Sequence, residues 1–199
     1  CLVGSEMCIR DRGEFNATPG PQLAAYSVKA AVERSGIEPE LIEDLVMGCG
    51  YPEGITGKNI GRQTALRAGL PLSVAGMVAS RFCASGLQSV AIAAGRIVAE
   101  GVPAMVAGGV ESISAIRAGN PADIDPWLQE HKPDLFMAMI DTADIVAHRY
   151  GISREDQDAF SLQSQQRTAA AQQAGVFADE IVPCTCLLYT SPSPRDKRQ

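Results

Sequence analysis

Short apolar runs alternate with helix-forming segments along the first half of the chain, and this alternation restricts the fold more than any other feature. Residues 44–49, 74–79 and 104–108 are apolar runs of strand length. Residues 60–68 and 84–100 lie between them, and each of these segments is followed by a glycine, as helices commonly are. Strands that alternate with helices predict right-handed crossovers between parallel strands. We therefore expect an α/β fold with a layered parallel sheet.

The segment at 84–100 is rich in Ala, Val and Ile, and its only charged residues are Arg96 and Glu100. A helix that is apolar nearly all round is usually buried on several sides, so we expect this one to lie between two sheets. Residues 21–35 begin with proline and are followed by glycine, which predicts another helix.

The character of the chain changes after residue 119. Residues 119–135 hold three prolines and four acidic residues, which indicates an exposed excursion from the layered core. We take 119–141 as a loop excursion within the domain. Helices are predicted at 141–150 and, from the capping-box pattern at 153–156, as far as about residue 175. The run at 180–183 is predicted to be a short strand.

Cys83 lies at the junction between a predicted strand and the helix that follows it, in the segment RFCASGL. The unpaired N–H groups and the positive dipole end of a helix favour the thiolate, which is the nucleophilic form of cysteine. The small residues Ala84, Ser85 and Gly86 leave room for a substrate beside the sulfur. The alternative is a buried structural cysteine, since free cysteine is among the most buried residue types. The junction favours covalent catalysis at Cys83 without naming a reaction.

The two ends of the chain have a relationship that is visible only in DNA. Residues 2–11 and 186–196 share no amino-acid similarity, yet opposite strands of one DNA sequence can encode both. Such an inverted repeat is typical of translated sequencing-library adapter, and a natural inverted repeat is the alternative. We therefore expect residues 1–12 and 186–199 to be non-native, as a fusion scar would be, and residues 13–185 to form the domain.

Charge and cysteine content restrict the partners and the compartment. The chain has a formal net charge of −6, and without the two ends it is more acidic still. We expect no binding of nucleic acid or membrane, because the chain lacks a basic excess and no apolar run approaches the length of a membrane-spanning helix. Between the suspect ends only Cys49, Cys83 and Cys184 remain, which gives no disulfide framework and predicts a reducing compartment, the cytoplasm.

The segment around Cys83 resembles the acyl-accepting cysteine motif of the thiolases, which are acetyl-CoA acetyltransferases and acetyl-CoA C-acyltransferases. Further segments resemble motifs of that family in the expected order: VAGGVESIS at 106–114, MIDTAD at 139–144, YGISREDQD at 150–158 and GVFADEIVP at 175–183. The resemblance covers roughly residues 15–185. It implies the N-terminal half of a thiolase, a layered αβα unit from a five-layer αβαβα fold, with an inserted loop region.

The resemblance implies a two-step reaction at Cys83. The sulfur accepts an acyl group, which then passes to CoA in 3-ketoacyl-CoA thiolysis or to deprotonated acetyl-CoA in the Claisen condensation. Negative charge develops on a thioester oxygen, and the backbone N–H of Cys83 is the expected donor to it. Acyl-CoA and CoA are then substrates, no separate cofactor is expected, and the full-length protein is expected to be a homodimer or homotetramer.

Met139 matches a methionine that lines the acyl pocket in the family, with an ordinary core methionine as the alternative. Ala138 stands where many biosynthetic thiolases have histidine, and Ile140 replaces their glycine. These departures argue against a strictly acetoacetyl-forming activity and leave room for longer acyl groups. The family's catalytic histidine and second cysteine match no position here, and His131 and His148 are predicted to be surface residues.

Other interpretations stay open. Glu111 is either catalytic or a carboxylate that makes structural hydrogen bonds at a strand end. The acidic residues at 141–158 are typical of helix starts, so no metal site is predicted. A ketoacyl synthase shares the fold and the cysteine but uses acyl carrier protein. A truncated fragment without activity is the other alternative, and it would expose apolar surface.

Overall fold

The structure is a computed structural model that describes Phe15, residues 18–113 and residues 124–184. The chain divides into one unit of residues 1–117 with 180–199, and a second unit of residues 118–179. Each unit is considered by itself. Both ends that are predicted to be non-native lie outside the described residues, as does the beginning of the predicted loop excursion.

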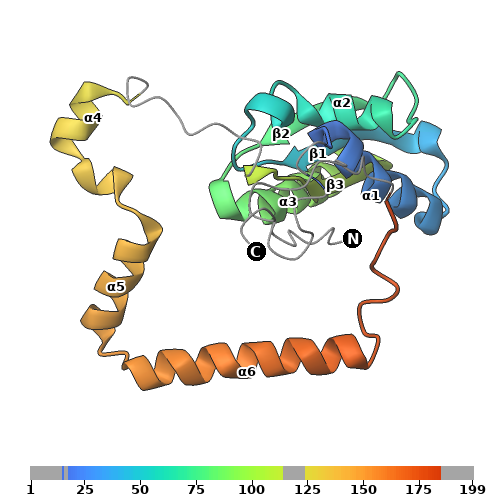
Figure 1. The fold of residues 1–199 in the computed structure, drawn as a ribbon. Coiled ribbons are helices and arrows are strands. Elements are labelled where there is room, and N and C mark those ends of the chain that lie inside the picture. Colours follow the sequence, from blue (N-terminus) through green and yellow to red (C-terminus); the bar gives the residue numbers. More distant parts are fainter. Residues whose placement is uncertain (1–14, 16–17, 114–123, 185–199) are drawn as a thin grey trace, which may run out of the picture. The chain divides into compact units, whose positions relative to one another are not determined.

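The first unit is built on a parallel sheet of three strands, in the order β2-β1-β3. The central strand β1 spans Ile42–Gly48, and β2 (Ala75–Ala79) and β3 (Ala104–Gly109) lie on either side of it. Helices α1 (Gly20–Ser35) and α2 (Ile60–Arg67) cover one face, and α3 (Ser85–Glu100) covers the other (Figure 1). The predicted αβα layering is confirmed.

Strand β1 forms the centre of the core because both of its faces are covered. Leu45 and Val46 are 0% exposed and Met47 is 2% exposed. Leu45 and Met47 pack with Ala24 and Val28 of α1 and with Ile60 of α2 in one hydrophobic cluster. This cluster supplies the apolar burial that stabilises the layer between the sheet and the two helices.

Two expectations about helix α3 are not met within the described residues. It is not buried on several sides, because the described residues provide a sheet on one side of it only. Its buried residues are Ser85, Ser89 and Ala93, whereas Leu87 is 76% and Val98 86% exposed. The segment Phe82–Glu100 also has the length and mean hydropathy, 1.4, of a helix that crosses a membrane. An apolar run of that length is therefore present, and here it packs one face on the sheet.

The single arginine of α3 has a structural partner on β1. Arg96 Nη1 lies 2.9 Å from Asp44 Oδ2, and Arg96 Nε lies 2.9 Å from Glu100 Oε2. Asp44 is 8% exposed, so the arginine supplies the counter-charge that a buried carboxylate needs. This pair accounts for a charged residue in an otherwise apolar helix and ties α3 to the central strand.

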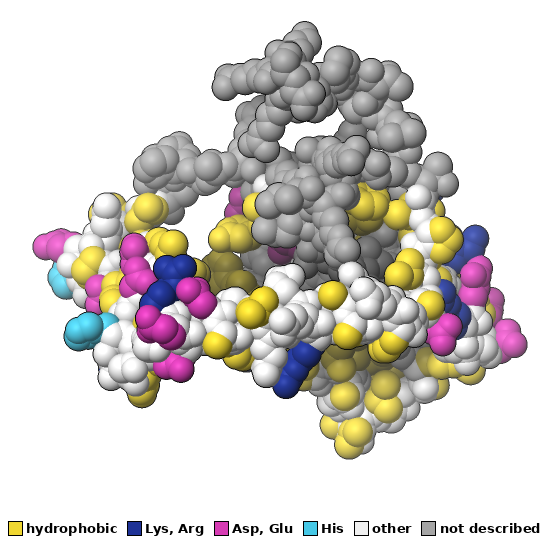
Figure 2. Space-filling model, turned by 60° about the horizontal axis from the view of Figure 1, so that its bottom comes forward, with side chains coloured by type: hydrophobic (Ala, Val, Ile, Leu, Met, Phe, Trp, Pro, Cys, Tyr) yellow, Lys and Arg dark blue, Asp and Glu magenta, His cyan; other side chains and the backbone are white. Residues whose placement is uncertain are grey.

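The second unit consists of helices without buried residues among those described. It contains α4 (Pro126–His131), η6 (Pro133–Phe136), α5 (Met139–Tyr150) and α6 (Arg154–Gln173). The predicted capping box is confirmed, since Ser153 and Asp156 bond reciprocally at the start of α6. Hydrophobic side chains lie on the surface among polar and charged ones (Figure 2).

The strand predicted at 180–183 is absent. Residues 181–184 have no regular secondary structure, and the described sheet has three strands, none of them from this segment. The carbonyl oxygen of Ile181 instead accepts a hydrogen bond from the Arg34 guanidinium at 3.2 Å. A short apolar run adopts strand geometry only when a neighbouring strand takes up its backbone hydrogen bonds.

Candidate active site

Cys83 lies where the chain passes from β2 to α3, at the predicted junction. One turn of 3-10 helix, η3 (Phe82–Ala84), precedes the α-helix, which begins at Ser85. Cys83 is thus in this 3-10 turn, one residue before the turn's end, and not in the first turn of the α-helix itself. Its side chain is exposed, so it is not a buried structural cysteine.

The hydroxyl of Ser85 holds the Cys83 turn, which we define as residues 81–85. Ser85 Oγ accepts a hydrogen bond from the Arg81 N–H at 2.8 Å and donates one to the Phe82 carbonyl oxygen at 2.6 Å. The side chain is 4% exposed, so water does not compete freely for these bonds. Small size was the only property expected of Ser85. The preference of serine for helix starts was the available signal in the sequence for this second role.

Phe82, the residue before the cysteine, has a left-handed backbone with φ +48°. For a residue with a bulky side chain this conformation costs about 1–3 kcal/mol and persists only where neighbours hold it. One such neighbour is Tyr51, whose ring meets the Phe82 ring edge-on, with centroids 5.6 Å apart and planes at 68°. The direction in which the chain enters Cys83 therefore depends on the loop that follows β1.

Glu111 binds that loop from the end of β3. Its Oε2 accepts hydrogen bonds from the N–H groups of Gly50 at 2.6 Å and Tyr51 at 3.2 Å, and its Oε1 accepts one from the Cys49 thiol at 3.6 Å. The carboxylate oxygens thus take up backbone groups that β1 leaves unpaired at its end. The interpretation of Glu111 as a carboxylate with structural hydrogen bonds is confirmed.

Cys49 differs from Cys83 in its surroundings. It is 1% exposed. Burial, together with the negative charge of Glu111 nearby, raises the pKa of the Cys49 thiol from 9.0 to about 11. Cys49 is therefore protonated at neutral pH and a poor nucleophile, because the thiolate is the reactive form.

The raised pKa of Cys49 predicts a loss of stability in mild alkali. Between pH 9 and 11 the unfolded chain has lost the thiol proton whereas the folded chain retains it, so the free energy of unfolding falls as pH rises. The expected loss is about 2 kcal/mol across this range. Urea denaturation of the chain and of its Cys49→Ala variant at pH 8, 9, 10 and 11 measures it. A variant with the same slope as the unsubstituted chain would show that other groups cause the change.

The cysteine lies at the edge of the sheet where ligands bind in α/β proteins. The chain leaves β1 for α2 on one face and leaves β2 for α3 on the other, and in α/β sheets such a divergence at the carboxyl ends of the strands is the usual place of a ligand site. A Cβ atom added at Gly86 would meet no atom of the described residues within 4 Å, so among these residues the start of α3 has open space on that side. This agrees with the expected room for a substrate.

The second unit holds three further residues named from the sequence, Met139, His131 and His148. Met139 is the first residue of α5 and is 75% exposed, and its role in an acyl pocket stays a prediction. His131 and His148 are exposed, as predicted. The His131 ring stacks on Trp127 with centroids 4.5 Å apart, and its Nδ1 lies 2.9 Å from the Trp127 carbonyl oxygen.

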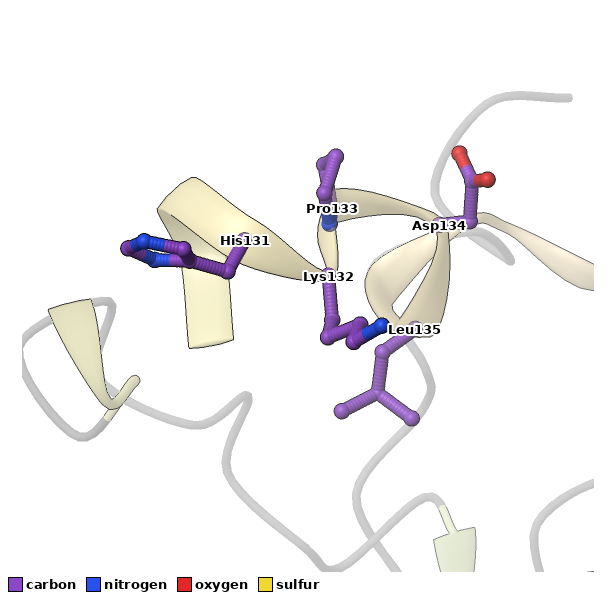
Figure 3. A pocket seen from close by; sticks show the side chains of 5 residues that line it. All are labelled: His131, Lys132, Pro133, Asp134 and Leu135. Carbon is purple, nitrogen blue, oxygen red and sulfur yellow. The ribbon is translucent and has the colours of Figure 1, made fainter. Parts of the chain in front are cut away.

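Two shallow pockets lie on the second unit. One is lined by His131, Lys132, Pro133, Asp134 and Leu135; the His131 ring extends to one side of it and the side chains of Lys132 and Leu135 to another (Figure 3). The other is lined by Asp144, Ile145, His148 and Arg149 of α5. Neither pocket contains Cys83. In the part of the chain that the structure describes, no group of three His, Cys, Asp or Glu side chains is placed to hold a metal ion.

Comparison with known proteins identifies one matching family. The family model described as "Thiolase, N-terminal domain" matches residues 3–190. An acetyl-CoA acetyltransferase of Chromobacterium violaceum is 42% identical over an alignment of 184 residues, and the alignment covers 86% of this chain and 47% of that protein. A 3-ketoacyl-CoA thiolase of Bacillus subtilis is 40% identical over 173 residues, 86% of this chain and 44% of that protein.

A third relative extends the range of acyl groups among these proteins. A β-ketoadipyl-CoA thiolase of Pseudomonas aeruginosa is 37% identical over an alignment of 193 residues, and the alignment covers 87% of this chain and 48% of that protein. The chain spans about half the length of the curated relatives it matches.

Proposed function

The chain belongs to the thiolase family, and from that premise we propose that its protein transfers acyl groups between acyl-CoA and either CoA or acetyl-CoA, with Cys83 as the nucleophile. The observation that carries this proposal is the exposed Cys83 in a turn fixed by Ser85, at the carboxyl edge of a parallel sheet. An exposed thiol in a rigid turn beside open space has the access and the fixed direction that covalent catalysis requires.

In the degradative direction, the Cys83 thiolate attacks the 3-keto carbon of a 3-ketoacyl-CoA. The bond between carbons 2 and 3 breaks, the electron pair leaves with the acetyl-CoA carbanion, and this carbanion takes up a proton. The acyl group remains on sulfur as a thioester, and the CoA thiol then attacks it to release acyl-CoA and the Cys83 thiol. The condensation runs through the same steps in reverse. N–H groups at the start of α3 are the proposed donors to the carbonyl oxygen that becomes negative.

Residues 138–140 are proposed to shape the acyl site, with longer acyl chains preferred over acetyl groups. Ala138 and Ile140 flank Met139 at the start of α5, where Met139 is 75% and Ile140 73% exposed. An adaptable thioether beside an aliphatic side chain suits a flexible apolar chain. The bulkier histidine expected from many biosynthetic thiolases is replaced by the small Ala138, which leaves more room.

Complete activity is proposed to need more protein than this chain. The exposed apolar side chains of α3, among them Leu87, Val90 and Val98, form a face too apolar to remain in water in a stable enzyme. We propose that the rest of the protein and a partner subunit, in a homodimer or homotetramer, cover such surface, and that the chain alone is inactive. The free thiols of Cys49 and Cys83 support the proposal of a reducing, cytoplasmic location.

Trapping the covalent intermediate tests the proposal directly. The complete gene product is mixed with a 3-ketoacyl-CoA in the absence of free CoA, quenched in acid and digested. Mass spectrometry should find the acyl mass on the peptide that holds Cys83, and added CoA should remove it before the quench. A peptide that stays unmodified while substrate is consumed, or an acyl group on another residue, would contradict the proposal.

A further inference from the structure

Glu111 connects two loops that leave neighbouring strands of the sheet. It is partly buried, and its Oε2 accepts the N–H groups of both Gly50 and Tyr51. Its Oε1 accepts the thiol of Cys49. Both carboxylate oxygens are therefore occupied by the segment that follows β1, and the side chain has a fixed position at the carboxyl edge.

The segment held by Glu111 is in turn packed against the Cys83 turn. A Cβ atom added at Gly50 would lie 2.8 Å from Glu111 Oε2 and 3.3 Å from the Phe82 carbonyl oxygen, so the Gly50 backbone fills the space between these two groups. Ser80 Oγ donates a hydrogen bond to the Gly50 carbonyl oxygen at 3.1 Å. The Tyr51 ring meets the Phe82 ring edge-on. Three contacts thus run from the loop after β1 to the loop after β2.

Phe82 is the point at which these contacts reach the nucleophile. Its left-handed backbone is unfavourable for a phenylalanine and would relax if its neighbours moved. Because Phe82 directly precedes Cys83, a change in the Phe82 backbone turns the sulfur away from its present direction. Displacements of about 1 Å at a reacting group can lower a rate about 100-fold.

We propose that Glu111 is a positioning residue for Cys83, acting through Gly50 and Tyr51 on the backbone of Phe82. The role concerns the acyl transfer proposed above and rests on it. Glu111 need not touch the substrate. Its carboxylate fixes two amide groups, these fix the tyrosine ring and the glycine backbone, and both hold the strained turn in which the sulfur is presented.

The test compares variants of the complete gene product in two independent measurements. Glu111→Ala removes both acceptors, Glu111→Gln keeps one acceptor oxygen and the shape, and Tyr51→Ala removes the ring contact. Glu100→Gln is the matched control, because Glu100 pairs with Arg96 at the far end of α3. The measurements are kcat and KM for thiolysis, and amide hydrogen exchange in the segment 80–86.

Glu111→Ala is expected to lower kcat about 10- to 100-fold with KM within about threefold, since a misdirected sulfur still leaves the binding surface intact. Glu111→Gln should recover a large part of kcat. Exchange in segment 80–86 should be about tenfold faster in Glu111→Ala and Tyr51→Ala and unchanged in Glu100→Gln. The double variant Glu111→Ala/Tyr51→Ala should be little worse than Glu111→Ala alone, because both changes break the same connection.

Two results would overturn the role of Glu111. One is a double variant in which the effects of the two single substitutions add. The other is hydrogen exchange and kcat that are both unchanged in Tyr51→Ala and in Glu111→Gln. These milder variants keep the test informative even if Glu111→Ala does not fold. The exchange measurement needs no substrate. A protein without acyl transfer but with faster exchange in the variants would therefore contradict the proposed function and still support the connection from Glu111 to the Cys83 turn.

Discussion

Replacing Cys83 with serine is expected to lower the turnover of acyl transfer at least about 1,000-fold in the complete gene product. The substitution changes one atom in an exposed side chain, so the fold should be unaffected. A serine hydroxyl is almost entirely protonated at neutral pH, whereas a thiol is readily deprotonated and intrinsically more nucleophilic. Removal of a nucleophile that acts within a catalytic unit typically costs several orders of magnitude in kcat.

Steady-state thiolysis of a 3-ketoacyl-CoA, with circular dichroism to verify folding, measures this effect. Cys184→Ser is the matched control, because Cys184 is another cysteine that follows α6, away from the β2–α3 junction in the sequence. The turnover of this variant should stay within about twofold of that of the unsubstituted protein. Turnover by Cys83→Ser equal to that of the unsubstituted protein would refute the assignment of Cys83 as nucleophile.

Replacing Gly48 with alanine is expected to destabilise the first unit by about 2–4 kcal/mol. Gly48 is the last residue of β1, and a Cβ atom there would lie 2.5 Å from the Ser85 carbonyl carbon and 2.7 Å from the Gly86 nitrogen. These atoms belong to the backbone at the start of α3 and have no rotamer by which to move aside. The helix must therefore shift away from the strand, and the Cys83 turn must shift with it.

Urea denaturation of the chain, monitored by circular dichroism, measures the loss. Gly95→Ala in the middle of α3 is the matched control, since a Cβ atom there meets no atom within 4 Å in the part of the chain that the structure describes. The control should be neutral or stabilising by up to about 1 kcal/mol, because alanine favours the helix over glycine. A Gly48→Ala variant as stable as the unsubstituted chain would show that α3 does not rest directly on the end of β1.

The boundaries of strands β1 to β3 and of helices α1, α2, α3, α5 and α6 were predictable to within about two residues, because they depend on local chemistry. Helix α4 was not predicted, since it lies within the segment 119–141 that was taken as a loop excursion. Glycines at 36, 101 and 151 have left-handed backbones at the ends of three helices, where the sequence places them. The capping box at Ser153 was equally readable. The prediction of a strand at 180–183 was wrong, because a strand requires a neighbouring strand to pair with, and no local sequence pattern supplies one.

The candidate site was predictable in part. Cys83 was placed correctly at a strand-to-helix junction, because apolar periodicity and small residues define both elements around it. We did not predict three features of the site: the 3-10 turn that holds Cys83, the left-handed backbone of Phe82, and the two hydrogen bonds of the Ser85 hydroxyl. All three depend on how the turn packs against β1. For Glu111, the sequence left two interpretations open, a catalytic role or structural hydrogen bonds, and did not decide between them.

The sequence by itself determined an α/β layer with a cysteine at the β2–α3 junction, since helix and strand periodicity, glycine stops and a family motif are properties of neighbouring residues. Tertiary structure decided which residues meet. The central place of β1, the pairing of Arg96 with Asp44, and the reach of Glu111 to Gly50 and Tyr51 join positions about 50 to 60 residues apart. Such contacts arise from packing of the whole sheet, because a carboxylate selects its partners from whatever donors the fold brings within hydrogen-bond distance.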